Sequence, residues 1–191
     1  THAYRDAPLA SGSGALPALA FSHGYTSFQS QNTALMEELA SHGYVVFSLG
    51  HTYDGSMVFP DGRATTLGEH ITRWYEVQFA NQEAMLAEMR TLVESSDQSA
   101  RIATLRKMQD QTKREKAERL GVAVSWDVWI QDRLAFFDVL EDRQSGVRPS
   151  PFRDRLDLDR IGLLGMSFGG ATAAEVCHLD PRCVAAVNLD G

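Results

Sequence analysis

The chain has 191 residues, of which 43% are hydrophobic and 23% are charged, and its formal net charge is -7 at pH 7. This length and composition suit one globular domain with a packed core and exclude a largely disordered polypeptide. The acidic balance also excludes extended contact with phosphate backbones, so we expect no nucleic-acid partner.

A β-α-β unit is predicted near the N-terminus. Residues 16–22 (LPALAFS) and 44–49 (YVVFSL) are short apolar runs typical of buried strands. Between them, residues 32–42 place apolar side chains on one helical face, and Gly43 follows as a stop signal.

The middle of the chain has a helical pattern. We predict a helical insertion at about residues 69–121, which serves either as ordinary packing or as a lid. Residues 126–141 are expected to form a helix packed on the sheet, and the Pro-rich and charged segment 143–159 is expected to be a loop.

The last third of the chain returns to short apolar strands. We predict a strand at residues 161–165, a helix at about 168–177 and a strand at 183–189. Apolar strands that alternate with helices indicate an α/β fold with a mostly parallel sheet covered by helices on both faces. We treat residues 1–191 as one domain of this kind.

Residues 165–169 (GMSFG) form a G-x-S-x-G pattern between a predicted strand and a predicted helix. A sharp turn there lifts the serine side chain above the sheet, and glycine at the flanking positions lets strand and helix approach closely. We therefore predict that Ser167 is the nucleophile of a hydrolase. The alternative is a glycine-rich turn with an inert serine.

Two backbone N–H groups would hold the oxyanion that forms when such a serine attacks a carbonyl. One belongs to the residue after the nucleophile, Phe168, and the other to the loop after an earlier strand, where we choose Tyr25. His23 stands in the same loop, and we expect it to order the loop by hydrogen bonding rather than to act as the base.

The acid of a catalytic triad is expected after the nucleophile, at the end of the following strand. Asp190 meets this requirement, whereas Asp180 is followed by Pro181 and is typical of a turn. The histidine should follow the acid, but none follows Asp190 in this sequence. None of the histidines present is a convincing base; they are His2, His23, His42, His51, His70 and His178.

We therefore expect that the chain is a fragment and that its sheet is incomplete. The last strands, the final helix and the catalytic histidine would come from a missing C-terminal segment or from a second chain.

Cys177 and Cys183 are the only cysteines. They are close enough in sequence to form a local disulfide, which would suit a secreted or periplasmic protein, but two buried thiols in a reduced protein fit equally well. The sequence leaves open whether the two cysteines pair. A secreted or periplasmic location is slightly favoured over a cytoplasmic one.

Several segments together resemble the platelet-activating factor acetylhydrolase family of α/β hydrolases, the lipoprotein-associated type and its bacterial relatives. They are residues 21–25 (FSHGY), 39–47 (LASHGYVVF), 51–56 (HTYDGS), 165–172 (GMSFGGAT) and 188–191 (NLDG). The resemblance implies the α/β-hydrolase fold, Ser167 as nucleophile, Asp190 as acid, and the Tyr25 and Phe168 amides as the oxyanion hole. Met166 differs from the histidine that these enzymes often carry before the nucleophile.

The resemblance implies hydrolysis of a short-acyl ester without a metal or cofactor. The substrate would be a small or lipid-like ester, such as an acetylated phospholipid or a simple aryl ester. One alternative is an enzyme like dienelactone hydrolase or a polyester-cleaving esterase. Another is a non-catalytic binding protein on the same fold, or an inert fragment.

Overall fold

The computed structural model describes residues 3–9, 14–118 and 120–190. The chain forms two compact units. The sheet unit comprises Thr1–Thr66 and Trp129–Gly191, and the helical unit comprises Leu67–Val128. Whether the whole chain behaves as one domain stays a prediction. Within the described residues, no helix has the length and apolarity needed to cross a bilayer.

Four strands form a parallel sheet in the sheet unit, in the order β2-β1-β5-β6. All four therefore end at the same edge of the sheet, which in parallel α/β folds is the edge where ligands bind. The strands are β1 (Leu16–Ser22), β2 (Val45–Leu49), β5 (Leu156–Met166) and β6 (Cys183–Leu189).

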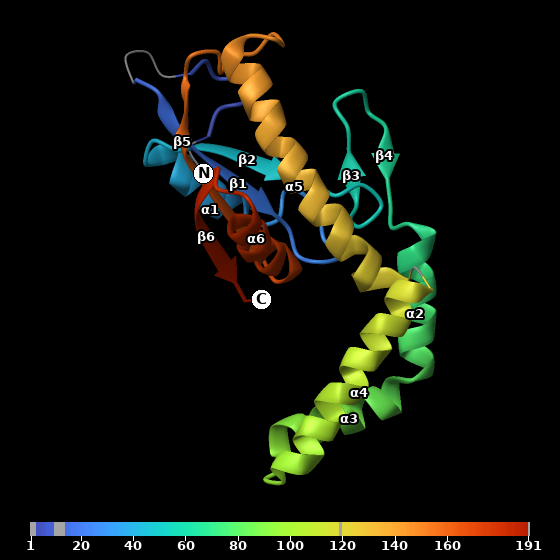
Figure 1. The fold of residues 1–191 in the computed structure, drawn as a ribbon. Coiled ribbons are helices and arrows are strands. Elements are labelled where there is room, and N and C mark those ends of the chain that lie inside the picture. Colours follow the sequence, from blue (N-terminus) through green and yellow to red (C-terminus); the bar gives the residue numbers. More distant parts are fainter. Residues whose placement is uncertain (1–2, 10–13, 119, 191) are drawn as a thin grey trace. The chain divides into compact units, whose positions relative to one another are not determined.

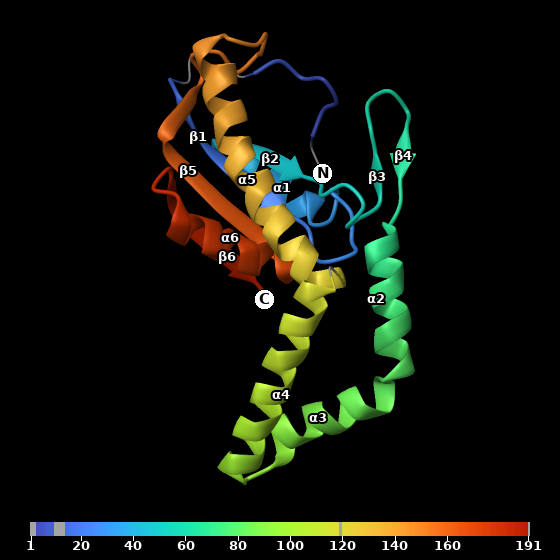
Figure 2. The same cartoon turned by 45° about the vertical axis from the view of Figure 1, so that its right-hand side comes forward.

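Helices cover both faces of this sheet (Figures 1 and 2). The connection from β1 to β2 steps towards one edge, and the connections from β2 to β5 and from β5 to β6 step towards the other. Because such crossovers are right-handed, the first helix lies on one face and the other two lie on the opposite face. The helices are α1 (Thr33–Ser41), α5 (Gly121–Ser145) from Trp129 onward, and α6 (Phe168–Leu179).

The sequence prediction was wrong about where β5 begins. Residues 156–159 were expected in a loop, but β5 starts at Leu156, which pairs with Leu16 of β1 and is buried. The side chain of Gln144 holds Leu156 by hydrogen bonds of 2.8 and 3.0 Å to its carbonyl and its N–H. The charged residues that follow Leu156 are partly or fully exposed, and the pairing with β1 shifts register there, since Pro17 pairs with Asp157 and Ala18 pairs with Ile161.

Helix α5 is also longer than the predicted 126–141, since it runs from Gly121 to Ser145. A short hairpin that the sequence did not predict, β3 (Met57–Val58) with β4 (Ala64–Thr65), follows the end of β2 in the sheet unit.

The helical unit holds α2 (Glu69–Ala80), α3 (Gln82–Glu94) and α4 (Gln98–Ala117). Helices do occupy the predicted insertion, but many of their large apolar side chains are exposed. The exposed residues include Phe79, Met85, Leu86, Met89, Val93, Ile102 and Leu105.

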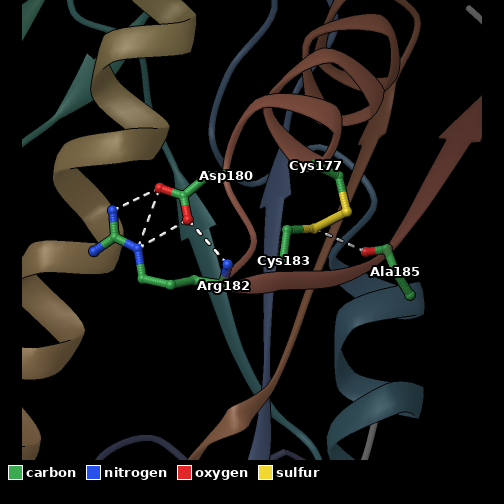
Figure 3. Close-up of a disulfide and its surroundings, with 5 residues drawn as sticks. All are labelled: Cys177, Asp180, Arg182, Cys183 and Ala185. Atoms are coloured by element: carbon green, nitrogen blue, oxygen red, sulfur yellow. Dashed lines mark hydrogen bonds and ion pairs between the residues drawn. A yellow bond between two sulfur atoms is a disulfide. The ribbon is translucent and has the colours of Figure 1, made fainter.

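Cys177 and Cys183 form a disulfide, which resolves the alternative that the sequence left open (Figure 3). The bond joins the last turn of α6 to the first residue of β6. Beside it, Arg182 donates to the carboxylate of Asp180 at 2.7 Å and to Asp138 of α5 at 2.7 Å. The ion pair with Arg182 lowers the pKa of Asp180. Asp180 is thus a structural turn residue, as its sequence context predicted.

Candidate active site

Ser167 lies at the junction between β5 and α6, with φ 49° and ψ −118°. A residue other than glycine rarely adopts this backbone conformation, which costs of order 1–3 kcal/mol and persists only where the surrounding structure imposes it. Ser167 is exposed, whereas residues 161–165 before it are buried. The turn therefore carries the serine out of the core at the carboxyl edge of the sheet.

The glycines around Ser167 are required by close backbone contacts. A side chain at Gly165 would overlap the backbone of Gly169 and Gly170, and one at Gly169 would overlap the carbonyls of Ser22 and His23. The G-x-S-x-G spacing is therefore mechanical, as the sequence indicated, because strand, helix and the loop after β1 meet without room for a Cβ atom.

Asp190 lies beside Ser167 in the sheet. Met166 pairs with Leu189 in the ladder of β5 and β6, and the Ser167 N–H donates to the Leu189 carbonyl at 2.7 Å. Asp190 follows directly, is exposed, and has a positive φ of 56°. The structure thus brings the predicted nucleophile and the predicted acid to neighbouring strand ends.

The two residues predicted to supply the oxyanion donors have neighbouring side chains. The aromatic rings of Tyr25 and Phe168 are 5.1 Å apart, centroid to centroid. Tyr25 follows the end of β1, and Phe168 is the first residue of α6. All four predicted site residues therefore gather where β1, β5 and β6 end.

His23 orders the loop that carries Tyr25. Its Nδ1 lies 2.7 Å from the Gly24 carbonyl oxygen, so this nitrogen must carry the proton and donate. Its Nε2 accepts from the backbone N–H of His51 at 3.4 Å. Burial lowers the pKa of His23 to about 4. His23 is therefore neutral at pH 7, and the expectation that it orders the loop is confirmed.

His51 is occupied in the same way. Its Nδ1 lies 2.7 Å from a carboxylate oxygen of Asp132, and its Nε2 lies 3.0 Å from the hydroxyl of Ser22. Burial lowers the pKa of His51, so the neutral ring donates to Asp132 and accepts from Ser22. Since both ring nitrogens of His23 and His51 have partners, neither is placed to serve Ser167.

Two of the remaining histidines lie elsewhere in the sheet unit. His42 is exposed and pairs with Glu38, and His178 is exposed near the end of α6. His70 belongs to the helical unit, and His2 lies outside the described residues. Among residues 3–9, 14–118 and 120–190, no group of His, Cys, Asp or Glu has the arrangement of a metal site.

A buried polar layer beneath the site was not predicted from the sequence. Ser22, His51 and Arg133 are almost fully buried, and Arg133 donates to the Gly169 carbonyl in the first turn of α6 at 2.6 Å. Burial lowers the pKa of the Arg133 guanidinium to about 9, so it remains charged at neutral pH. His51 could have been placed here, since it follows β2 at the same sheet edge as His23. Asp132 and Arg133 are helix residues with no comparable signal.

A model of the family described as platelet-activating factor acetylhydrolase, isoform II, matches residues 1–191. The platelet-activating factor acetylhydrolase of Cavia porcellus is 27% identical over 91% of this chain and 34% of the relative. The protein of the same name from Bos taurus is 28% identical over 91% of this chain and 34% of its own length. The chain thus spans about a third of the length of these curated relatives.

A ferulic acid esterase from Streptomyces cinnamoneus has a similar structure, with a TM-score of 0.57 and 28% sequence identity. The match covers 93% of this chain and 37% of the esterase. This match confirms the predicted α/β fold. It is consistent with a chain that forms part of an α/β-hydrolase fold. The chain is therefore related to esterases by sequence and by structure.

Proposed function

The chain belongs to the platelet-activating factor acetylhydrolase, isoform II, family, and we propose that it hydrolyses carboxylic esters through an acyl-enzyme on Ser167. The observation that carries this proposal is the backbone of Ser167, an exposed serine held at φ 49° between β5 and α6. A strained strand-to-helix turn with a serine at its tip is characteristic of a nucleophilic serine in this class of fold.

The proposed reaction begins with attack of the Ser167 hydroxyl on the ester carbonyl. The oxyanion of the tetrahedral intermediate accepts hydrogen bonds from the N–H groups of Tyr25 and Phe168. The alcohol leaves with a proton, and water then hydrolyses the acyl-enzyme. The closeness of the Tyr25 and Phe168 rings, 5.1 Å apart, supports a shared role for their backbones.

Asp190 is proposed to orient a histidine that takes the proton from Ser167 and returns it to the leaving group. Its position after β6, one residue beyond the partner of the Ser167 N–H, supports this role. The histidine is proposed to come from residues outside the described ones, in a further segment or in a second chain.

The proposed substrate is an ester with a short acyl group. The relatives are named for platelet-activating factor and ferulic acid, so an acetylated phospholipid-like ester and a simple aryl ester are the two classes to compare. A series of p-nitrophenyl esters of increasing acyl length tests this, and activity that falls steeply beyond acetate and propionate is expected.

Fluorophosphonate labelling followed by peptide mapping tests the nucleophile. The protein as its gene encodes it should gain one adduct, on Ser167, and S167A should gain none. S56A is the matched control, because Ser56 is an exposed serine in a neighbouring loop, and it should label like the wild type. A folded wild-type protein that takes no adduct would contradict ester hydrolysis and favour a binding role.

A further inference from the structure

Ser22, His51 and Asp132 have the hydrogen-bond connectivity of a catalytic triad, with 3.0 Å between serine oxygen and imidazole and 2.7 Å between imidazole and carboxylate. Ser22 is completely buried, however, so no substrate can reach its hydroxyl. These three residues are distinct from the proposed nucleophile, acid and oxyanion donors, and the reaction proposed above assigns them no part.

The three residues lead to the proposed oxyanion hole through two further hydrogen bonds. The backbone N–H of His51 donates to His23 Nε2, and His23 Nδ1 donates to the Gly24 carbonyl. In a trans peptide the carbonyl and the next N–H point in opposite directions. Holding the Gly24 carbonyl towards His23 therefore fixes the direction of the Tyr25 N–H.

The surroundings of His51 restrain it further. Trp129 stacks on the His51 ring with 3.7 Å between centroids and an interplanar angle of 11°, and its edge contacts the ring of Phe168 at 4.9 Å. The Trp129 indole also donates to Asp54 at 2.6 Å, and the Asp54 carbonyl accepts from the Thr26 N–H at 3.0 Å. One aromatic side chain thus connects His51 to both predicted donor segments.

We propose that His51, held between Ser22 and Asp132, is a positioning residue that sets the direction of the Tyr25 N–H for ester hydrolysis. This inference rests on the proposed function. His51 acts through His23 and the Gly24 peptide and does not touch the substrate. Asp132 is the accessible member, since its side chain is 45% exposed, and it can be changed without opening the core.

The main test compares Asp132→Ala with Asp132→Asn and with Asp138→Ala. Alanine removes the acceptor of the His51 Nδ1 proton, whereas asparagine keeps an oxygen that can accept it. Asp138 is the matched control, because it is an exposed carboxylate on the same helix that pairs with Arg182 instead. D132A should lower kcat with KM nearly unchanged, by up to the about 100-fold to 1,000-fold that loss of one oxyanion donor costs. D132N should recover most of the loss.

Two readouts distinguish positioning from a general loss of stability. Affinity for a trifluoromethyl ketone, which forms an oxyanion on the enzyme, should fall in D132A by the same factor as kcat/KM. The NMR amide signal of Tyr25 should shift in D132A and stay in place in D138A. His51→Asn keeps a donor towards Asp132 and His51→Gln keeps an acceptor towards Ser22, so each should fall between wild type and His51→Leu.

The outcomes separate the two claims. An unchanged Tyr25 amide in D132A, or a shifted amide with wild-type kcat and inhibitor affinity, overturns the positioning role while the Ser167 adduct leaves the proposed function standing. A wild-type protein without the Ser167 adduct overturns the proposed function and, with it, any role of His51 in ester hydrolysis.

Discussion

Most of the large, fully buried side chains lie in the sheet unit, whereas many large apolar side chains of the helical unit are exposed. In the sheet unit, Trp129, Phe137 and Leu163 are at most 1% exposed, and polar groups such as Ser22 and His51 are buried with hydrogen-bond partners. In the helical unit, Phe79 is 67% and Val93 is 80% exposed. Both regions are regular in secondary structure, so regularity alone does not distinguish them.

This difference indicates that the geometry of the candidate site depends on the buried packing around it and not on the amount of helix or strand. Strained residues persist only where the surroundings are rigid, and Ser167 sits on such surroundings. Substitutions near the site should therefore be costly, whereas substitutions of exposed residues in the helical unit should be tolerated. Matched changes in the two units test this comparison.

The largest difference is expected for one phenylalanine in each unit. Phe137→Ala should lower the free energy of unfolding by about 3–5 kcal/mol, because it empties a buried volume in the core. Phe79→Ala should lower it by about 1 kcal/mol or less, because the ring is mostly exposed. Urea unfolding of both variants measures the two values. Equal losses of unfolding free energy in the two variants would contradict the proposed difference between the sheet unit and the helical unit.

A smaller effect is expected from the buried histidines as the pH falls. The pKa of His23 decreases from 6.5 to about 4 on folding. Between these two pH values the unfolded chain therefore binds a proton at His23 that the folded protein does not bind. Stability should therefore be highest above pH 6.5 and decrease between about pH 6.5 and 4, by up to about 3 kcal/mol for His23. The burial of His51 acts in the same direction.

The variant His23→Gln should flatten this dependence in part, because it removes the buried imidazole. Urea unfolding at several values of pH measures the slopes. Indistinguishable slopes in wild type and His23→Gln would show that this histidine does not titrate with the predicted linkage.

The next smaller effect on stability is expected from removal of the disulfide between Cys177 and Cys183. A loop closed by cysteines with a sequence separation of 6 restricts the unfolded chain, which is worth about 2 kcal/mol in the chain-entropy description. The double variant C177A/C183A should lose about this amount, and the loss should affect the sheet unit, where both cysteines lie. A reducing agent should destabilise the wild type and leave the double variant unchanged; a similar effect on both would argue against the bond.

The smallest difference concerns surface charges. Arg182 binds Asp138, Asp180 and Glu141, and its side chain is 30% exposed. Arg182→Ala should cost about 1 kcal/mol, because a network of charges is lost. Lys113→Ala in the helical unit should cost less than about 0.5 kcal/mol, because its single pair is exposed. High salt should reduce the first cost, and a cost that salt does not change would point to packing instead.

Much of the sheet was predictable because its signals are local. The apolar runs at Leu16–Ser22 and Cys183–Leu189 mark β1 and β6 as the structure has them. Glycine spacing around Ser167 predicted the turn, since a backbone contact that excludes a Cβ atom leaves a direct trace in the sequence. The start of β5 was not predicted, because the charged residues around the buried Leu156 break the apolar pattern that is typical of a buried strand.

The sequence by itself thus determined the order of the four sheet strands and their covering helices along the chain, the turn at Ser167, and the candidates Asp190, Tyr25 and Phe168. Tertiary structure alone decided the pairing of Cys177 with Cys183 and the buried contacts of His51 with Ser22 and Asp132. For the cysteines, which have a sequence separation of 6, the physical reason is that α6 and β6 set the distance of 4.9 Å between the two Cα atoms. For His51, the physical reason is separation along the chain. Local patterns record the backbone geometry of neighbouring residues, whereas a hydrogen bond between residues 51 and 132 exists only after the sheet and α5 have packed.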